Sequence, residues 1–430
     1  MSNNAVEDFS SDNDVIEGIE RSIKTDKAIE KKKDPKGSLI ALVVVILGAA
    51  LVAILLILAN GNSIAATGQL VSETSSSQFY NIYESLKYEK SIHILAMLLV
   101  GFGFLMVFVR KHGFSSITAT FLVVSVALPL YMVIRSFGGE FQISITSIDS
   151  FILAEFAAAS LLIAIGAPLG RLKMDQYLAM AVLFIPAYIL NEWLILESGY
   201  FPGFVDAGGS VVIHAFGAYF GLGVISNTLA KFKDEPQCEA NSTSNQFCLI
   251  GSMMLWIFWP SFTSALVAPE LVPLTAINTV FALCGATLAT YVFSRIIRGK
   301  IEIEDIANAA LAGGVAIGSV CNLTSPGFAI LIGLVAGTLS TVGYAIIAPK
   351  VEKLIKGTDT CGVHNLHGMP GILGGLSGMF FANSPGVQFT GILITVIIAF
   401  SLGKVAGVLI RLMGQKEIAY SDDDEFLTDH

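Results

Sequence analysis

Charged side chains are scarce in this sequence. They make up 14% of its 430 residues, whereas hydrophobic residues make up 54% and the mean hydropathy is +0.71. A soluble domain carries about 25% charged residues. So little charge leaves too small a polar surface to coat a soluble globule of this size. The composition therefore excludes an ordinary soluble fold and indicates that the lipid bilayer is the solvent.

Several chemical signatures are also missing. The five cysteines form no CxxC motif and no disulfide framework, and most lie in or beside apolar runs as small buried hydrophobes do. No metal-ligand set, nucleophile–base pair or phosphate-binding loop is visible. The first apolar run begins near residue 38, behind a charged tail, so no cleavable signal peptide is predicted. We therefore expect that the protein is not an enzyme and that it binds no cofactor, no metal and no nucleic acid.

Long apolar runs dominate the rest of the chain. A helix needs about 20 apolar residues to cross a bilayer. Twelve runs approach this length: 38–60, 91–109, 115–136, 149–169, 177–197, 208–230, 247–267, 272–296, 306–321, 327–348, 362–382 and 387–411. We predict an all-α membrane domain over 38–412 with about 12 transmembrane helices.

The two ends and the loops indicate an orientation. Residues 1–37 form a charged tail, and residues 413–430 form an acidic one. Lysine and arginine concentrate before the first run and in alternate loops, which places those loops and both tails in the cytosol by the positive-inside rule. Both tails are predicted to be solvated.

Ionisable residues inside a membrane are costly and are candidates for function. His214 lies early in the sixth run and His364 early in the eleventh, so the two runs are five apart and antiparallel. This arrangement is typical of an inverted repeat of five helices, here preceded by one extra helix. It would bring His214 and His364 together near the middle of the membrane. Asp206 precedes His214 by eight residues, and Asp359 precedes His364 by five. The alternative is that each histidine only bonds a neighbouring helix, which is how we interpret His367.

The segments around these histidines carry a family resemblance. DAGGSVVIHAFGAYFGLGV (206–224) and DTCGVHNLHGMPGILGG (359–375), supported by WIFWPSFTSAL (256–266), AINT (276–279) and NAALAGGVAIGS (308–319), resemble the Rh glycoprotein branch of the ammonium transporter/Rh superfamily. The resemblance runs in order from about residue 38 to 412.

The resemblance implies roles for individual residues. The paired pore histidines of the family match His214 and His364, and its two gate phenylalanines match Phe156 and Phe262. Its outer and inner structural acids match Asp206 and Asp359, and Glu192, in LNEW, resembles the outer acid that recruits ammonium. The usual NADF is here Leu153-Ala154-Glu155-Phe156, which departs from the pattern just before the first phenylalanine.

The resemblance also implies a function. It predicts a central pore in each protomer of a homotrimer, in the plasma membrane or a vacuolar or contractile-vacuole membrane. Ammonium or methylammonium is recruited outside and deprotonated, and the neutral amine passes a hydrophobic pore. An ion that enters a medium of low dielectric costs tens of kcal/mol, whereas a neutral amine costs only a few. The alternatives are a carbon dioxide channel of the same architecture and a non-conducting sensor or scaffold.

Overall fold

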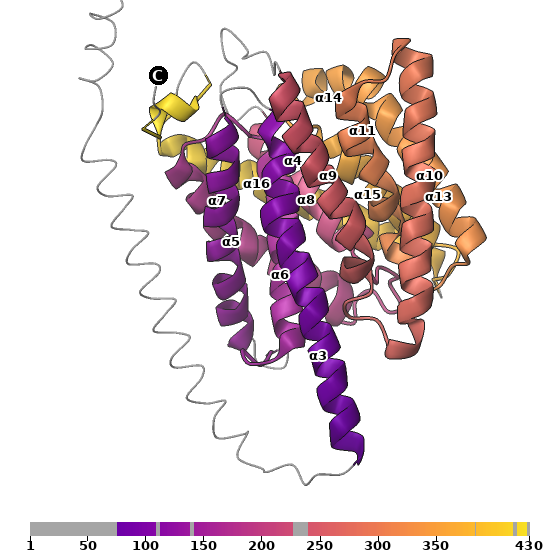
Figure 1. Ribbon diagram of the computed structural model, residues 1–430. Coiled ribbons are helices and arrows are strands. Elements are labelled where there is room, and N and C mark those ends of the chain that lie inside the picture. Colours follow the sequence, from indigo (N-terminus) through magenta and orange to yellow (C-terminus); the bar gives the residue numbers. More distant parts are fainter. Residues whose placement is uncertain are drawn as a thin grey trace, which may run out of the picture. The chain divides into compact units, whose positions relative to one another are not determined.

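The computed structural model describes residues 75–108, 112–137, 142–226, 240–382, 384–415 and 419–427, and for 75–81 the backbone alone. All regular secondary structure in these segments is helical (Figure 1). The predicted tail 1–37 and the first predicted span, 38–60, lie outside the described residues.

The first half of the described chain runs through α9. Its helices are α3 (Ser75–Ala96), continued by η1 (Met97–Phe102), α4 (Gly103–Leu105) and η2 (Met106–Phe108), then α5 (Gly113–Ser136), α6 (Ile148–Gly166), α7 (Met174–Glu192) with η4 (Trp193–Glu197), η5 (Ser210–Ala215) with α8 (Phe216–Ile225), and α9 (Ser242–Thr263).

The second half begins after α9. Its helices are η6 (Pro269–Leu271) with α10 (Val272–Arg298), α11 (Ile303–Asn308) with η7 (Ala309–Leu311), α12 (Ala312–Ile317) and η8 (Gly318–Val320), α13 (Pro326–Val342) with η9 (Gly343–Ile347) and α14 (Ala348–Ile355), η10 (His364–Gly368) with α15 (Met369–Gly378), α16 (Pro385–Leu412) and η11 (Asp422–Asp424).

The predicted spans after the first all coincide with helices. Within the described residues, nine helical stretches are long and apolar enough to cross a membrane by length and composition, and Ser210–Ile225 is a shorter apolar helix. The eleventh predicted span corresponds to η10 and α15, which together cover His364–Gly378. The all-α membrane fold is thus confirmed, and the two histidine-bearing spans are shorter than the sequence predicted.

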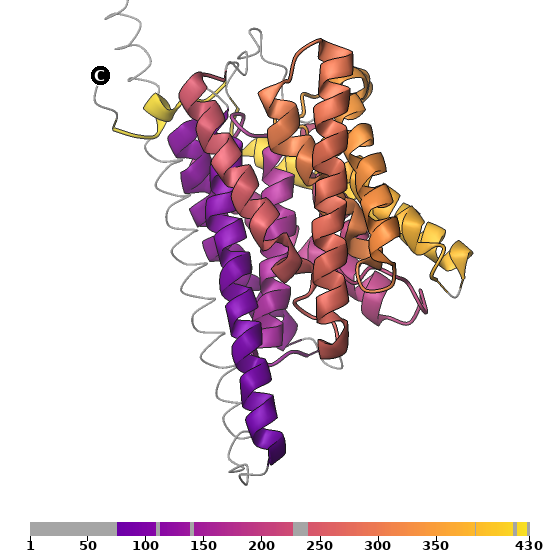
Figure 2. The same ribbon diagram turned by 45° about the vertical axis from the view of Figure 1, so that its right-hand side comes forward.

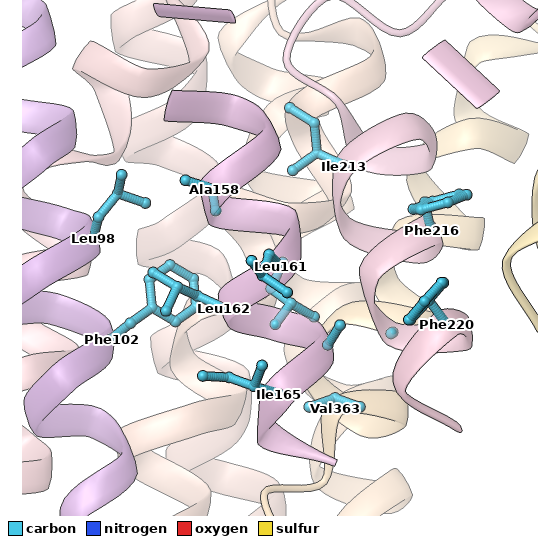
Figure 3. Packing of buried hydrophobic residues seen from close by; sticks show 14 of the residues in the cluster. Leu98, Phe102, Ala158, Leu161, Leu162, Ile165, Ile213, Phe216, Phe220 and Val363 are labelled. Atoms are coloured by element: carbon cyan, nitrogen blue, oxygen red, sulfur yellow. The ribbon is translucent and has the colours of Figure 1, made fainter. Parts of the chain in front are cut away.

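Helix α6 lies at the centre of the hydrophobic core. From Ala154 to Gly166 every residue of α6 is buried. Figure 3 shows its Leu161, Leu162 and Ile165 between Phe102 of η1 and the η5–α8 segment. Helices α10 and α13 pack against each other, as do α8 and α16. Buried small residues let the backbones of these helices approach closely. In lipid the hydrophobic effect does not drive helices together, so close packing of small residues takes its place.

Helix α3 lies along α9 in both ribbon views, and its N-terminal end extends past the neighbouring helices (Figures 1 and 2). It also packs against α6. Because α3 contacts two helices that are distant in sequence, side chains along it can bond to both.

The acidic C-terminal segment packs on the helices in part, while its Asp423, Asp424 and Glu425 stay exposed, as expected of a solvated tail. Asp422 accepts hydrogen bonds from the backbone N–H groups of Phe114 and Ser115 at the start of α5, at 3.1 and 2.8 Å. Tyr420 is buried, and the Phe426 ring lies 6.0 Å from that of Phe114. The free N–H groups at a helix start attract a carboxylate, which explains why an acidic sequence docks there.

Candidate functional site

Two short π-helical turns occupy equivalent places in the two halves of the chain. The first, η5, follows Asp206 and Gly209. Asp206 accepts hydrogen bonds from the N–H groups of Val211 and Val212 and from the Ser319 hydroxyl. Gly209 has φ +74°, a left-handed conformation that residues with a side chain seldom adopt. The carboxylate and the glycine together start this helix in the interior.

The second turn, η10, follows Asp359 and Gly362 and repeats this construction. Asp359 accepts from the N–H groups of Val363 and His364 at 3.0 and 2.9 Å, and Gly362 has φ +65°. Burial raises the pKa of Asp359 to about 6, although these backbone donors act to lower it. Burial also raises the pKa of Asp206, although its hydrogen bonds from the Ser319 hydroxyl and from backbone N–H groups act to lower it. Both acids are therefore helix-starting groups.

The two turns bring His214 and His367 together. Their Nδ1 atoms are 3.2 Å apart, their ring centroids are 5.3 Å apart, and the ring planes differ by 8°. Both side chains are buried. Neither ring can donate to the other unless one Nδ1 lacks a proton, so at least one imidazole of the bonded pair is neutral. The Nε2 atom of His214 has no hydrogen-bond partner in the described part of the chain, which leaves it available to a guest molecule.

The predicted pairing of His214 with His364 is therefore wrong, because His367 is the partner. The His364 ring instead meets Tyr219 edge-on, with centroids 5.8 Å apart. Residues three apart share a face in an α-helix, but the wider i→i+5 turn of a π-helix separates them. Since His364 and His367 both belong to η10, the π turn directs them to different neighbours.

Two phenylalanines cover the histidine pair on one side. Phe156 of α6 and Phe262 of α9 lie with ring centroids 4.6 Å apart and planes at 48°, and both are buried. The Phe262 centroid is 6.0 Å from that of His214. Trp259, one turn before Phe262, stacks on His214 with centroids 5.6 Å apart. The rings form a continuous column from Phe156 to His367.

A cavity lies at the other end of this column. It is lined mainly by apolar side chains, and His367, Asn308 and Cys361 are its polar members; the others are Phe102, Leu105, Met106, Phe108, Leu162, Ile163, Gly166, Val363 and Leu366. The Phe102 ring also stacks loosely on His367, with centroids 6.3 Å apart. The paired imidazoles thus stand between a closed aromatic constriction and an apolar cavity.

Glu192 lies in a buried cluster and is 3% exposed. The Tyr131 hydroxyl donates to its carboxylate at 2.6 Å, and the Arg135 guanidinium is 3.6 Å away. Arg135 also makes a bidentate pair with Glu197, at 3.0 and 2.8 Å. The Arg135 guanidinium therefore lies between two carboxylates and bonds more closely to Glu197 than to Glu192.

Sequence comparison assigns the family. Residues 45–426 match the profile of the Ammonium Transporter Family. The chain belongs to the ammonium transporter family. It is 41% identical over 324 residues to the human protein named ammonium transporter Rh type B, covering 72% of this chain and 67% of that protein. The protein of the same name in Danio rerio is 39% identical over 321 residues, with 71% and 67% covered. The chain is a multi-pass membrane protein.

Solved structures agree with this family assignment. Rh50 of Nitrosomonas europaea, described with a mechanism of conduction by the Rhesus protein family of channels, has a TM-score of 0.78 at 52% identity and covers 81% of this chain and 94% of its own. Mep2 of Saccharomyces cerevisiae has a TM-score of 0.66 at 16% identity, covering 80% and 92%, and shows likeness of fold alone.

The spacing from the preceding aspartate distinguishes His364 from His367 in the sequence. His214 follows Asp206 by eight residues, and His367 follows Asp359 by eight, whereas His364 follows by five. Each acid is also followed three residues later by its left-handed glycine. Equal spacing from equivalent acids identifies His367 as the counterpart of His214. Trp259, the other ring of the column that sequence reasoning missed, has no such signal.

Proposed function

We propose that this protein conducts ammonia, the uncharged form of ammonium, along the column formed by Phe156, Phe262, His214 and His367. The observation that carries the proposal is a pair of buried imidazoles bonded through Nδ1, closed on one side by two phenylalanines and open on the other to an apolar cavity. Family membership and the names of the relatives support ammonium as the substrate.

The column favours a neutral guest for a physical reason. An ammonium ion that leaves water for a medium of low dielectric costs tens of kcal/mol, while ammonia costs a few. Two touching phenylalanine rings offer no polar atom to offset that cost. Ammonium must therefore release a proton to the surrounding water before it reaches the constriction. Beyond it, neutral imidazole nitrogens can accept an N–H of ammonia or donate to its lone pair.

The acids have supporting roles in this proposal. Asp206 and Asp359 start η5 and η10 and so hold the two histidines in register. Glu192 was expected to recruit ammonium, but its carboxylate is buried, accepts a hydrogen bond from Tyr131 and lies 3.6 Å from Arg135. We assign it a structural role, which fixes α5 against α7.

The assembly and the location are inferred from the family resemblance. We infer a homotrimer with one pore in each protomer, in a plasma or vacuolar membrane, with both tails cytosolic. Large apolar side chains on the outer surfaces of α9, α10, α13 and α16 are compatible with contact to lipid or to neighbouring protomers. Membership of a transporter family supports the expectation that the chain is not an enzyme.

The test is ammonia flux into proteoliposomes that contain a pH-sensitive dye. An ammonium gradient should make the lumen alkaline faster than in protein-free vesicles, and acidification by carbon dioxide should be unchanged. Equal alkalinisation with and without protein would refute the proposal. Acceleration of carbon dioxide entry alone would favour the gas-channel alternative.

A further inference from the structure

The C-terminal part of α3 is hydrogen-bonded to both helices that carry the phenylalanine pair. Lys90, Ser91 and His93 lie within four residues of one another, and each bonds to α6 or to the end of α9. We call these three residues and their partners the α3 clamp. Neither phenylalanine belongs to α3, so its bonds act on the constriction from outside.

The contact with α6 is made next to the first phenylalanine. The Ser91 hydroxyl donates to Oε1 of Glu155 at 2.9 Å, and Glu155 immediately precedes Phe156. Both side chains are buried, Glu155 completely. The Oε2 atom of Glu155 has no hydrogen-bond partner among the described residues. Ser91 is therefore the hydrogen-bonding partner that holds this carboxyl, and the bond anchors the α6 turn that bears Phe156.

The contacts with α9 flank the second phenylalanine. His93 Nδ1 lies 2.9 Å from the Ser261 hydroxyl, and its ring stacks on Phe258 with centroids 4.6 Å apart. Lys90 donates to the backbone carbonyl of Ser264 at 2.8 Å. A cation suits the carbonyl-rich C-terminal end of a helix. Ser261 and Ser264 thus tie the two sides of Phe262 to α3.

From this arrangement we propose that the α3 clamp sets the separation of Phe156 and Phe262 and thereby decides which amines pass. Ser91 and His93 are positioning residues, because they act through the helices that carry the rings. Packed interiors deform little, so a ring separation of 4.6 Å is held only while both helices stay fixed. Weakening either bond should loosen the constriction and admit a bulkier amine. This inference rests on the proposed ammonia pore.

The test compares Ser91→Ala and His93→Phe with the wild type in the full-length protein. Ser91→Ala removes the hydroxyl, and His93→Phe keeps a ring on Phe258 but loses Nδ1. Ser136→Ala is the matched control, because the Ser136 hydroxyl is also buried but bonds within its own helix, to the Val133 carbonyl. Ser91→Thr, which retains the hydroxyl, should restore the wild-type behaviour.

The readout is the ratio of methylamine flux to ammonia flux in proteoliposomes. Loss of one buried hydrogen bond changes an equilibrium constant by a factor of about five. We therefore expect the ratio of methylamine flux to ammonia flux to rise about fivefold in both clamp variants. Ser136→Ala should leave it unchanged. A general loss of folding would lower both fluxes together and leave the ratio alone. An unchanged ratio in both clamp variants, with normal ammonia flux, would overturn the inference.

A structure of Ser91→Ala gives a second readout that does not depend on transport. We expect the separation of the Phe156 and Phe262 centroids to depart from 4.6 Å. An unchanged separation would overturn the clamp even if the protein conducts ammonia. Absence of wild-type ammonia flux would refute the proposed function instead, so the two failures are distinguishable.

Discussion

Replacing His367 by leucine removes one half of the imidazole pair and keeps a side chain of similar bulk. The substitution deprives His214 of its Nδ1 partner at 3.2 Å and takes one polar group from the cavity wall. Leucine is preferable to alanine, because the space left by alanine could admit water and hide the loss. His364→Leu is the matched control, since it replaces a second histidine of the same η10 turn that faces Tyr219.

The size of the effect follows from the small number of polar groups along the column. Ammonia between Phe262 and the cavity has the two imidazoles as polar contacts, and a buried polar group without its hydrogen bond costs about 1–3 kcal/mol. Each 1.4 kcal/mol corresponds to a factor of ten in rate. We therefore expect His367→Leu and His214→Leu to slow ammonia flux by about 5- to 150-fold, and His364→Leu to leave it near the wild-type value.

Stopped-flow fluorescence of dye-loaded proteoliposomes measures this flux, with equal amounts of folded protein confirmed by gel filtration. The double variant His214→Leu/His367→Leu should be little worse than either single variant, because each single change already breaks the pair. If His364→Leu were as slow as His367→Leu, or if His367→Leu conducted like the wild type, the assignment of the pore pair would be refuted.

Three further predictions concern the constriction and the acids. Phe262→Ala should open the column and allow proton or cation leak, measured as current in planar bilayers; an unchanged current would contradict a gate at this ring. Glu192→Gln should leave the apparent affinity for ammonium within about twofold while lowering thermal stability, because its carboxylate accepts from Tyr131 a hydrogen bond worth about 1.5–3 kcal/mol and lies 3.6 Å from Arg135. A large loss of affinity in flux titrations would restore the recruitment role. Because burial raises the pKa of Asp359 to about 6, the folded chain holds this proton more tightly than the unfolded chain does, so its contribution to stability should fall as pH rises from about 4 to 6. Melting temperatures of Asp359→Asn, measured between about pH 4 and 6, should not show this fall with rising pH. If the variant showed the same fall as the wild type, the pH dependence would belong to another group.

The bilayer explains why so much of the fold was predictable. A spanning segment must be helical and apolar over a defined length, because lipid offers no partner to an unpaired backbone group. The predicted spans from 91–109 to 387–411 accordingly coincide with helices. The ends of the helices were less predictable. The start of η5 is set by the Asp206 carboxylate and by Gly209, and the docking of the segment around Asp422 depends on backbone N–H groups of α5.

The sequence by itself determined the membrane fold and the two histidine-bearing segments, because hydrophobic length and long local motifs are properties of the chain alone; the two phenylalanines followed from the family resemblance of those motifs. Only the tertiary structure decided that His367 and not His364 meets His214, that Glu192 is buried beside Tyr131 and Arg135, and that α3 bonds both helices of the constriction. Each of these depends on how a turn is wound or on which helices are neighbours. A π turn differs from an α turn by the carbonyl to which each N–H bonds, and the packing around it selects between them.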